Sequence, residues 1–283
     1  MDSGRIVIAG CGFLGEAAAG FFCEAGWSVL GLCGTEESAS KLAGRPFAVA
    51  AVDISRPIAV PSGWERPDVV IHCASSGRGG VEAYRAVYRD GLEHLRDAFS
   101  PGRLIFTGST SVYSQVDGGW VTEESPAEPD RETGRVLLEA EKIALDTGGI
   151  VARLAGIYGP GRSVLLKKFL EGSAVLEAGG NRWMNQIHRD DGARALMRLA
   201  QDPGAVGIYN VCDDAPTTQR DIYGWIAAFL DRPLPPEGPA DLNRKRGWTS
   251  KRISNARLRA FGWCPQYPDY RAALPELIAA RSF

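Results

Sequence analysis

The chain has 283 residues, 45% of them apolar, and a formal net charge of −2. That length allows one large domain, or one domain with a smaller lobe. A nearly neutral chain without a long run of like charge gives no electrostatic footprint for nucleic acid or an anionic membrane. We therefore expect a small-molecule partner, with no nucleic acid and no membrane.

The cysteines and the N-terminus indicate a cytoplasmic protein. Six cysteines are scattered without a C-x-x-C pair or a metal-binding spacing, and the three histidines add none, so no metal site is expected. The first residues lead directly into a strand pattern without a signal peptide. No apolar run approaches the ~20 residues that a membrane span needs.

Apolar runs of strand length alternate with helical patterns over the first half of the chain. We expect strands at residues 6–9, 28–33, 47–52, 69–74, 103–108 and 150–154, and helices at 14–25, 81–99 and 131–147. Such alternation is typical of parallel sheets. The sequence therefore predicts an α/β fold with a doubly wound parallel sheet of the Rossmann type.

The composition changes after Gly156, where glycine, proline and tryptophan become more frequent. We expect residues 1–155 to form a dinucleotide-binding domain. Residues 156–283 would form mainly a smaller C-terminal substrate lobe, with 183–212 returning to the Rossmann domain. Residues 231–251 are rich in proline and charge and are expected to form a surface loop.

Residues 10–15 read Gly-Cys-Gly-Phe-Leu-Gly between the first strand and the first helix. In this setting Gly10 permits a tight turn, Gly12 lets the backbone approach a pyrophosphate, and Gly15 allows close packing of helix on strand. The helix N-terminus then offers N–H groups to the phosphates. NAD or NADP is the expected cofactor; the alternative is a tight turn that binds nothing.

The residue that usually selects between the two dinucleotides stands at the end of the second strand. Here that position is Cys33, followed by Gly34 and Thr35. An acid would bind the ribose hydroxyls, and an arginine would meet the 2′-phosphate. Neither is present at that position, so both dinucleotides stay open.

The chain resembles the extended short-chain dehydrogenase/reductases, the NAD-dependent epimerase/dehydratase family, over almost its whole length. The matching segments follow the family's order at residues 10–15, 52–54, 73–75, 107–113, 153–162, 187–191, 251–258 and 261–265. Residues 133–141, Thr-Gly-Arg-Val-Leu-Leu-Glu-Ala-Glu, are similar to those of atypical members.

The resemblance implies further cofactor residues besides Phe13 and Leu14 of the glycine loop. Asp53 would bond the adenine amine, with a strand-end cap as the alternative role, and Ile54 would pack on the ring. The backbone of Cys73, Ala74 and Ser75 would line the cofactor. The helices expected at 81–99 and 131–147 imply a homodimer, because this pair joins subunits in many family members.

The catalytic residues implied by the resemblance are incomplete. Ser109 stands where the family has a Ser or Thr that bonds the substrate oxygen, although such a serine can also satisfy backbone groups at a strand end. The family's acid/base is a Tyr followed four residues later by a Lys, whose charge favours tyrosinate. Thr133 and Leu137 occupy those two positions.

Three interpretations follow. The chain is an oxidoreductase or epimerase/dehydratase-like enzyme whose proton donor has moved, to Tyr113 or Tyr158 in preference to His188. Alternatively, it binds the dinucleotide without turnover, as a redox sensor or scaffold. In the third, it catalyses proton chemistry in which the nicotinamide only fills space.

The substrate side is expected to be polar or anionic. Arg162 follows a Gly-Pro-Gly turn, and its guanidinium suits a carboxylate or phosphate. Asn185 and Arg182 precede His188 and are expected in the same cleft. Lys251 and Arg252 could close it from the C-terminal side, and the alternative for these two is a solvated loop. The substrate is therefore predicted to be a small polar or anionic carbonyl or alcohol compound.

Overall fold

A computed structural model describes residues 3–77, 79–241 and 248–280 of the chain. Seven strands, all paired in parallel, form one sheet in the order β12-β7-β5-β4-β1-β2-β3. Their bounds are β1 Arg5–Ala9, β2 Ser28–Cys33, β3 Ala48–Ala51, β4 Val69–His72, β5 Arg103–Ser109, β7 Ile150–Leu154 and β12 Gly207–Val211. The predicted doubly wound parallel sheet is confirmed.

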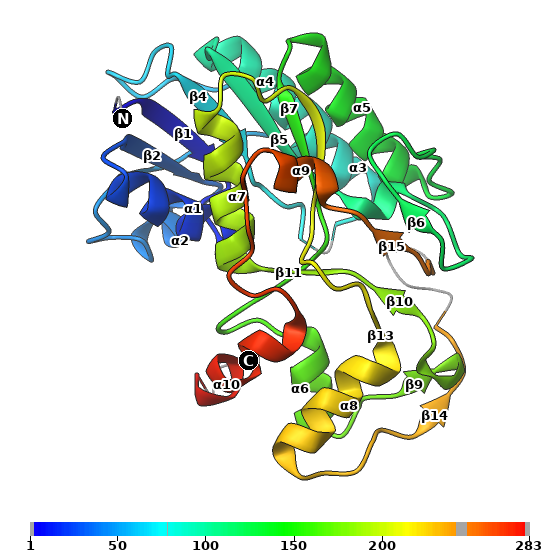
Figure 1. Cartoon of the computed structure of the whole chain (residues 1–283). Coiled ribbons are helices and arrows are strands. Elements are labelled where there is room, and N and C mark those ends of the chain that lie inside the picture. The colour runs from blue at the N-terminus through cyan, green and yellow to red at the C-terminus, as the bar shows by residue number, and fades with distance from the viewer. Residues whose placement is uncertain (1–2, 78, 242–247, 281–283) are drawn as a thin grey trace.

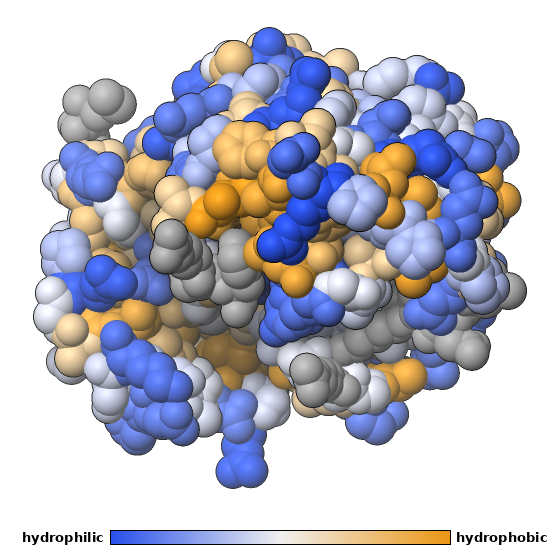
Figure 2. Space-filling view, turned by 90° about the horizontal axis from the view of Figure 1, so that it is seen from below, coloured by the Kyte–Doolittle hydropathy of each residue, from blue (hydrophilic) through white to orange (hydrophobic). Residues whose placement is uncertain are grey.

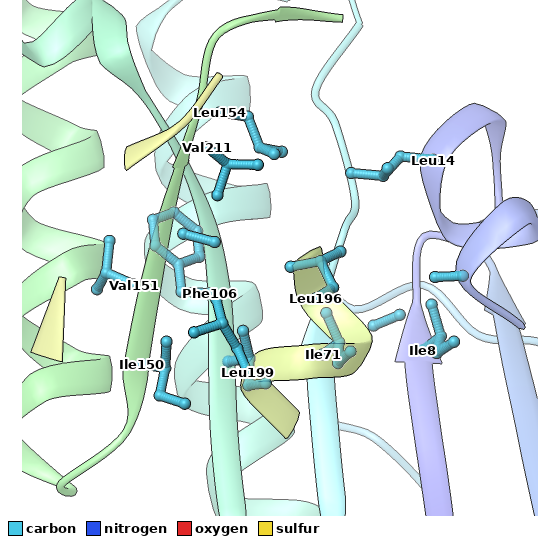
Figure 3. Packing of buried hydrophobic residues seen from close by; sticks show 14 of the residues in the cluster. Ile8, Leu14, Ile71, Phe106, Ile150, Val151, Leu154, Leu196, Leu199 and Val211 are labelled. Carbon is cyan, nitrogen blue, oxygen red and sulfur yellow. The ribbon is translucent and has the colours of Figure 1, made fainter. Parts of the chain in front are cut away.

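Helices cover both faces of this sheet (Figure 1). On one face, α1 (Phe13–Glu24) packs against α7 (Arg189–Gln201). Leu196 and Leu199 of α7 lie near Ile71 of β4 in the main apolar core (Figure 3). α5 (Glu132–Asp146) packs on β5 and β7. The short helices α2 (Glu36–Ser40) and α9 (Ala256–Ala260) pack against the edge strands β3 and β12.

The helix expected at residues 81–99 is interrupted. It consists of α3 (Val81–Tyr84), a π-helical segment η1 (Arg85–Asp90) and α4 (Gly91–Phe99). A π-helical turn inside an α-helix is uncommon and often occurs at functional sites. The segment packs against α5, and so the interruption lies beside the helix that carries Thr133 and Leu137.

A second apolar core belongs to the smaller lobe below the sheet in Figure 1. Its helices are α6 (Val164–Leu170), α8 (Gln219–Leu230) and α10 (Tyr270–Ala279). Seen from this side, hydrophobic residues form patches between hydrophilic ones (Figure 2), and Phe229 and Leu234 of this lobe are exposed.

Short strand pairs lie outside the main sheet. They are β8 (Gly156–Tyr158) with β11 (Gln186–His188), β6 (Trp120–Val121) with β15 (Arg252–Ile253), β10 (Trp183–Met184) with β13 (Thr217–Thr218), and β9 (Leu176–Glu177) with β14 (Glu237–Gly238). The 3-10 turns η2 (Thr110–Val112) and η3 (Ala178–Gly180) complete the elements. β14 lies inside the loop expected at 231–251, of which residues 242–247 are outside the described residues.

None of the helices in the described ranges combines the length and the apolar character that a bilayer span requires.

One buried ion pair connects α5 to the sheet. The Nε atom of Arg153 on β7 donates to Oε1 of Glu141 at 3.0 Å, and its second terminal nitrogen donates to Oε2 at 2.6 Å. Both side chains are almost fully buried. The guanidinium also lies 4.8 Å from the centre of the Tyr113 ring.

Glu141→Gln should destabilise the protein by about 3–5 kcal/mol, because it leaves the Arg153 charge buried and uncompensated. Urea unfolding measures the loss. Asp146→Asn is the matched control, since it breaks an exposed pair with Lys142 one turn further along the same helix. That change should stay within about 0.5 kcal/mol. Equal effects of the two substitutions would contradict the expectation.

Candidate active site

The turn after β1 is built by glycines. Gly10 has a φ of +85°, and a Cβ atom added there would lie 2.3 Å from the backbone nitrogen of Ala74. A Cβ atom on Gly15 would lie 2.4 Å from the carbonyl oxygen of Gly10. A Cβ atom on Gly12 would meet nothing within 4 Å. The first and third glycines therefore serve close packing, whereas the second leaves open space in front of α1.

That open space belongs to a cavity of about 350 Å³, the glycine-loop pocket. It lies beyond the N-terminus of α1, where the first-turn N–H groups have no partner within the helix. The pocket brings together nine of the predicted cofactor residues: Gly10, Gly12, Phe13, Leu14, Cys33, Gly34, Cys73, Ala74 and Ser75. Ser109 and Arg162 line it as well.

Four predicted cofactor residues do not line this pocket. Gly15 packs beneath the turn. Oγ1 of Thr35 accepts the Ser38 N–H and caps α2. Oδ1 of Asp53 accepts both the N–H and the hydroxyl of Ser55, which is the strand-end role considered for it. Ile54 is buried against α4 beside Gly91. The side chains of Thr35 and Asp53 thus bond locally instead of facing the pocket.

The end of β2 still does not select a dinucleotide. Cys33, Gly34 and Ser38 form this side of the pocket. Burial raises the pKa of the Cys33 thiol, so the residue is a neutral wall. Among the described residues that line the pocket, none at this end is an acid or an arginine.

Ser109 ends β5 and is mostly buried. Its Oγ accepts the Ser111 N–H at 3.2 Å, as expected of a serine at a strand end. The structure gives its hydroxyl proton no acceptor within the described ranges, so this proton can be donated to a ligand. Ser109 also lines a neighbouring cavity of about 320 Å³, the serine pocket, with Ser111, Asn185, Arg182, Thr249 and Lys251.

Thr133 and Leu137 lie where the family's Tyr and Lys would act. Both line a third cavity, the α5 pocket, with Tyr84, Ser111, Trp248 and Thr249. Leu137 and Tyr84 also line the glycine-loop pocket. The three pockets therefore meet around Ser109, Ser111 and Leu137, and Tyr84 is the phenol at this junction.

Tyr84 and Tyr88 are the site residues that sequence reasoning missed. Tyr84 ends α3, Tyr88 lies in the π-helical segment, and both are mostly buried in the wall of the glycine-loop pocket. Their ring centres are 4.9 Å apart, and the Tyr88 hydroxyl donates to Oγ of Ser75 at 3.5 Å. Their spacing of four on the helix after β4 was the available signal, because that helix starts beside the pocket.

Tyr113 is not in any of these pockets, contrary to its expected role as proton donor. Its ring is fully buried, and its hydroxyl donates to Oδ1 of Asn210 at 2.9 Å. The turn η2 after Ser109 directs the side chain into the core beside Arg153. Burial raises the pKa of this phenol. Tyr113 therefore has a structural role in the core.

Tyr158, the other predicted donor, lies away from Ser109. It is buried in the wall of the small-lobe cavity, which Ser163, Arg182, Tyr223 and Tyr270 also line. Burial raises the pKa of its phenol far above the usual value, which makes proton release unfavourable.

His188 has a structural role. The residue is buried, and its Nδ1 accepts the Asp190 N–H, so His188 caps α7. Asp191 instead accepts the N–H groups of Gln266 and Tyr267.

The two predicted substrate residues differ in what their side chains can do. The Arg162 guanidinium lies 5.2 Å from the centre of the Phe13 ring, in the glycine-loop pocket instead of the serine pocket. This place suits a cofactor phosphate better than a substrate. Asn185 lines the serine pocket, but its amide donates to the carbonyl of Lys251 and accepts the Ile253 N–H. It positions β15 and has little capacity left for a ligand.

Across residues 3–77, 79–241 and 248–280, no group of three His, Cys, Asp or Glu side chains could hold a metal ion.

Relatives of known sequence and structure cover nearly the whole chain. Protein YeeZ of Escherichia coli is 28% identical over 277 residues, which are 94% of this chain and 97% of that protein. A Methylobacillus flagellatus structure, assigned provisionally as an NAD-dependent epimerase/dehydratase, is 29% identical with a TM-score of 0.79, and the match covers 99% of both chains.

A more distant structure shows the same fold. DesIV, a dTDP-glucose 4,6-dehydratase from Streptomyces venezuelae solved with NAD bound, is 19% identical. Its TM-score is 0.81, with 98% of this chain and 96% of that chain covered. A sequence model described as the NAD dependent epimerase/dehydratase family matches residues 6–212, and the chain therefore belongs to this family.

Proposed function

We propose that the chain is an NAD(P)-dependent oxidoreductase or epimerase/dehydratase-like enzyme that acts on a small polar or anionic carbonyl or alcohol compound. The observation that carries the proposal is the junction of the three pockets. There, a glycine loop suited to a dinucleotide, the hydroxyl of Ser109 and the phenol of Tyr84 border connected spaces.

The glycine-loop pocket fits a dinucleotide. The open space at Gly12 and the first-turn N–H groups of α1 suit a pyrophosphate, and Arg162 over Phe13 can add a cation to it. Cys33 and Gly34 would lie toward the adenosine end, and Ser75 toward the nicotinamide end. When bound, NAD(P) would supply or accept a hydride.

The chain's own groups would handle the substrate oxygen. The Ser109 hydroxyl, which already accepts the Ser111 N–H, donates its proton to that oxygen and orients it. The Tyr84 phenol donates the proton that completes reduction of a carbonyl. A positioned acid of this kind typically contributes 10²–10⁴-fold to the rate.

Leu137 supplies no charge to the proton donor. In the family pattern a lysine at that position assists ionisation of the tyrosine, and leucine offers no charge. The proposed site therefore lacks the positive charge that accompanies the phenol in the family pattern.

Thermal denaturation with NAD, NADH, NADP and NADPH in turn identifies the dinucleotide that the protein binds. A ligand at about 100 times its dissociation constant should stabilise the protein by ~2.7 kcal/mol. A panel of carbonyl compounds with the reduced form of that dinucleotide then tests turnover. Stabilisation without turnover across a broad panel would favour the sensor or scaffold role. The homodimer and the cytoplasmic location stay predictions, and light scattering tests the first.

Gly12→Val should abolish most of the stabilisation by the dinucleotide, because the new side chain fills open space in the phosphate path. The fold should persist, since a Cβ atom there meets no protein atom within 4 Å. Calorimetric titration of the folded variant measures the loss. Gly20→Ala is the matched control, because it lies on the same helix and also meets nothing. A Gly12→Val protein with unchanged dinucleotide affinity would refute the assignment.

Tyr84→Phe should lower kcat for carbonyl reduction by roughly 10²-fold or more, because it removes the proton donor and keeps the ring. Dinucleotide affinity should change little. Tyr113→Phe is the control: it removes a phenol that bonds Asn210 in the core, and should lower stability without a comparable loss of kcat. If the two variants lose kcat equally, or if only Tyr113→Phe does, Tyr84 is not the donor.

A further inference from the structure

Two cations border the serine pocket, the buried Lys251 and the partly buried Arg182, and neither forms an ion pair within the described residues. Lys251 is only 3% exposed, and its Nζ donates to the backbone carbonyl of Tyr113 at 2.6 Å. Arg182 lines the same pocket, and its buried Nε has no hydrogen-bond partner. No aspartate or glutamate is among the described residues that line this pocket.

Among the described residues, Arg182 is the charged group that acts on Lys251. Both burial and this neighbour lower the pKa of Lys251 to about 7. The Arg252 Nε donates to the Gly118 carbonyl, and its guanidinium lies over Trp120 and over Trp183, which lines the serine pocket. Arg182 also borders the small-lobe cavity, which Glu177 and Asp241 line. Like charges in a mostly buried wall without a paired anion cost free energy that a bound anion would recover.

We propose that Arg182 and Lys251 form an anion site in the serine pocket, which binds a carboxylate or phosphate group of the substrate. Ser109 lines the same pocket. A substrate whose anionic group binds Arg182 would therefore have its carbonyl or hydroxyl oxygen near Ser109. The assignment of the anion to the substrate rests on the proposed function; binding of the anion does not. The substrate class is then a small carbonyl or hydroxy compound that carries one carboxylate or phosphate.

Arg182 is placed to report occupation of the site. Its guanidinium lies 5.2 Å from the centre of the Trp248 ring, and Trp183 lines the serine pocket. The indole N–H signals of these two tryptophans can be followed by NMR during titration with inorganic phosphate and, separately, with acetate. These signals distinguish the serine pocket from the glycine loop, where a phosphate would also bind.

Both signals should shift in a saturable way with at least one of the two anions. Tighter binding of phosphate would indicate a phosphate group on the substrate, and tighter binding of acetate a carboxylate. Arg182→Met should weaken this binding at least tenfold. That substitution removes a side chain for which the described residues offer no hydrogen-bond acceptor, so folding should be preserved. Lys251→Met should weaken it similarly. Lys168→Met is the matched control, because it removes a lysine that lines only the small-lobe cavity, and it should leave the affinity unchanged.

The affinity for acetate should fall as the pH rises through about 7, where free Lys251 loses its proton. Acetate keeps its charge in this range, so a fall in affinity would reflect deprotonation of a group on the protein. Affinity that is independent of pH, or equal in Arg182→Met and Lys168→Met, would overturn the anion site. If the anions bind as expected but no carbonyl compound is reduced, the site stands and the proposed enzyme activity fails.

Discussion

The architecture of the site depends on how closely the turn after β1 approaches the end of β4. At Gly10 any side chain would collide with the backbone of Ala74, so only glycine lets these segments touch. Because β1 lies between β4 and β2, the strand order changes direction there, and a crevice opens beyond the carboxyl ends of the strands. Residues 73–75 follow β4 and Ser109 ends β5, so they border the same crevice.

Strands and the glycine loop could be predicted because their signals are local. A buried parallel strand is a continuous apolar run, and Ser28–Cys33 and Ile150–Leu154 have the expected bounds. Side-chain direction is a tertiary property and could not be predicted in the same way. One 3-10 turn sends Tyr113 into the core, and local hydrogen bonds occupy Asp53 and Thr35. Tyr84 belongs to none of the family motifs, and its place in the walls of two pockets, on a helix packed against α5, makes it a candidate.

In the family pattern one helix face carries both the phenol and the positive charge. This chain lacks that Tyr and Lys, and in the proposed site the two groups come from different parts of the fold. A phenol and a positive charge four residues apart act on the same proton. In the proposed site the phenol comes from Tyr84, which lines the α5 pocket, and the charges come from Arg182 and Lys251. These charges lie in the serine pocket and act on the substrate instead of on the phenol. An anionic substrate would then bring its own counter-charge, which a neutral sugar would not.

Lys251 is far from Ser109 in the chain, and its position depends on two residues for which the sequence analysis expected other roles, Tyr113 as a proton donor and Asn185 as a substrate ligand. The Tyr113 carbonyl accepts the bond from Nζ, and the Asn185 amide holds the backbone on both sides of Arg252. Both residues therefore support the proposed anion site by holding the segment that carries Lys251: Tyr113 through its backbone, Asn185 through its side chain. Asn185→Ala would free the backbone at Lys251 and Ile253, and should weaken anion binding while leaving both cations in the chain. Neighbouring motifs mark the positions of Tyr113 and Asn185 in the sequence. The sequence could not show that both residues hold Lys251 in place, because that contact arises only in the folded chain.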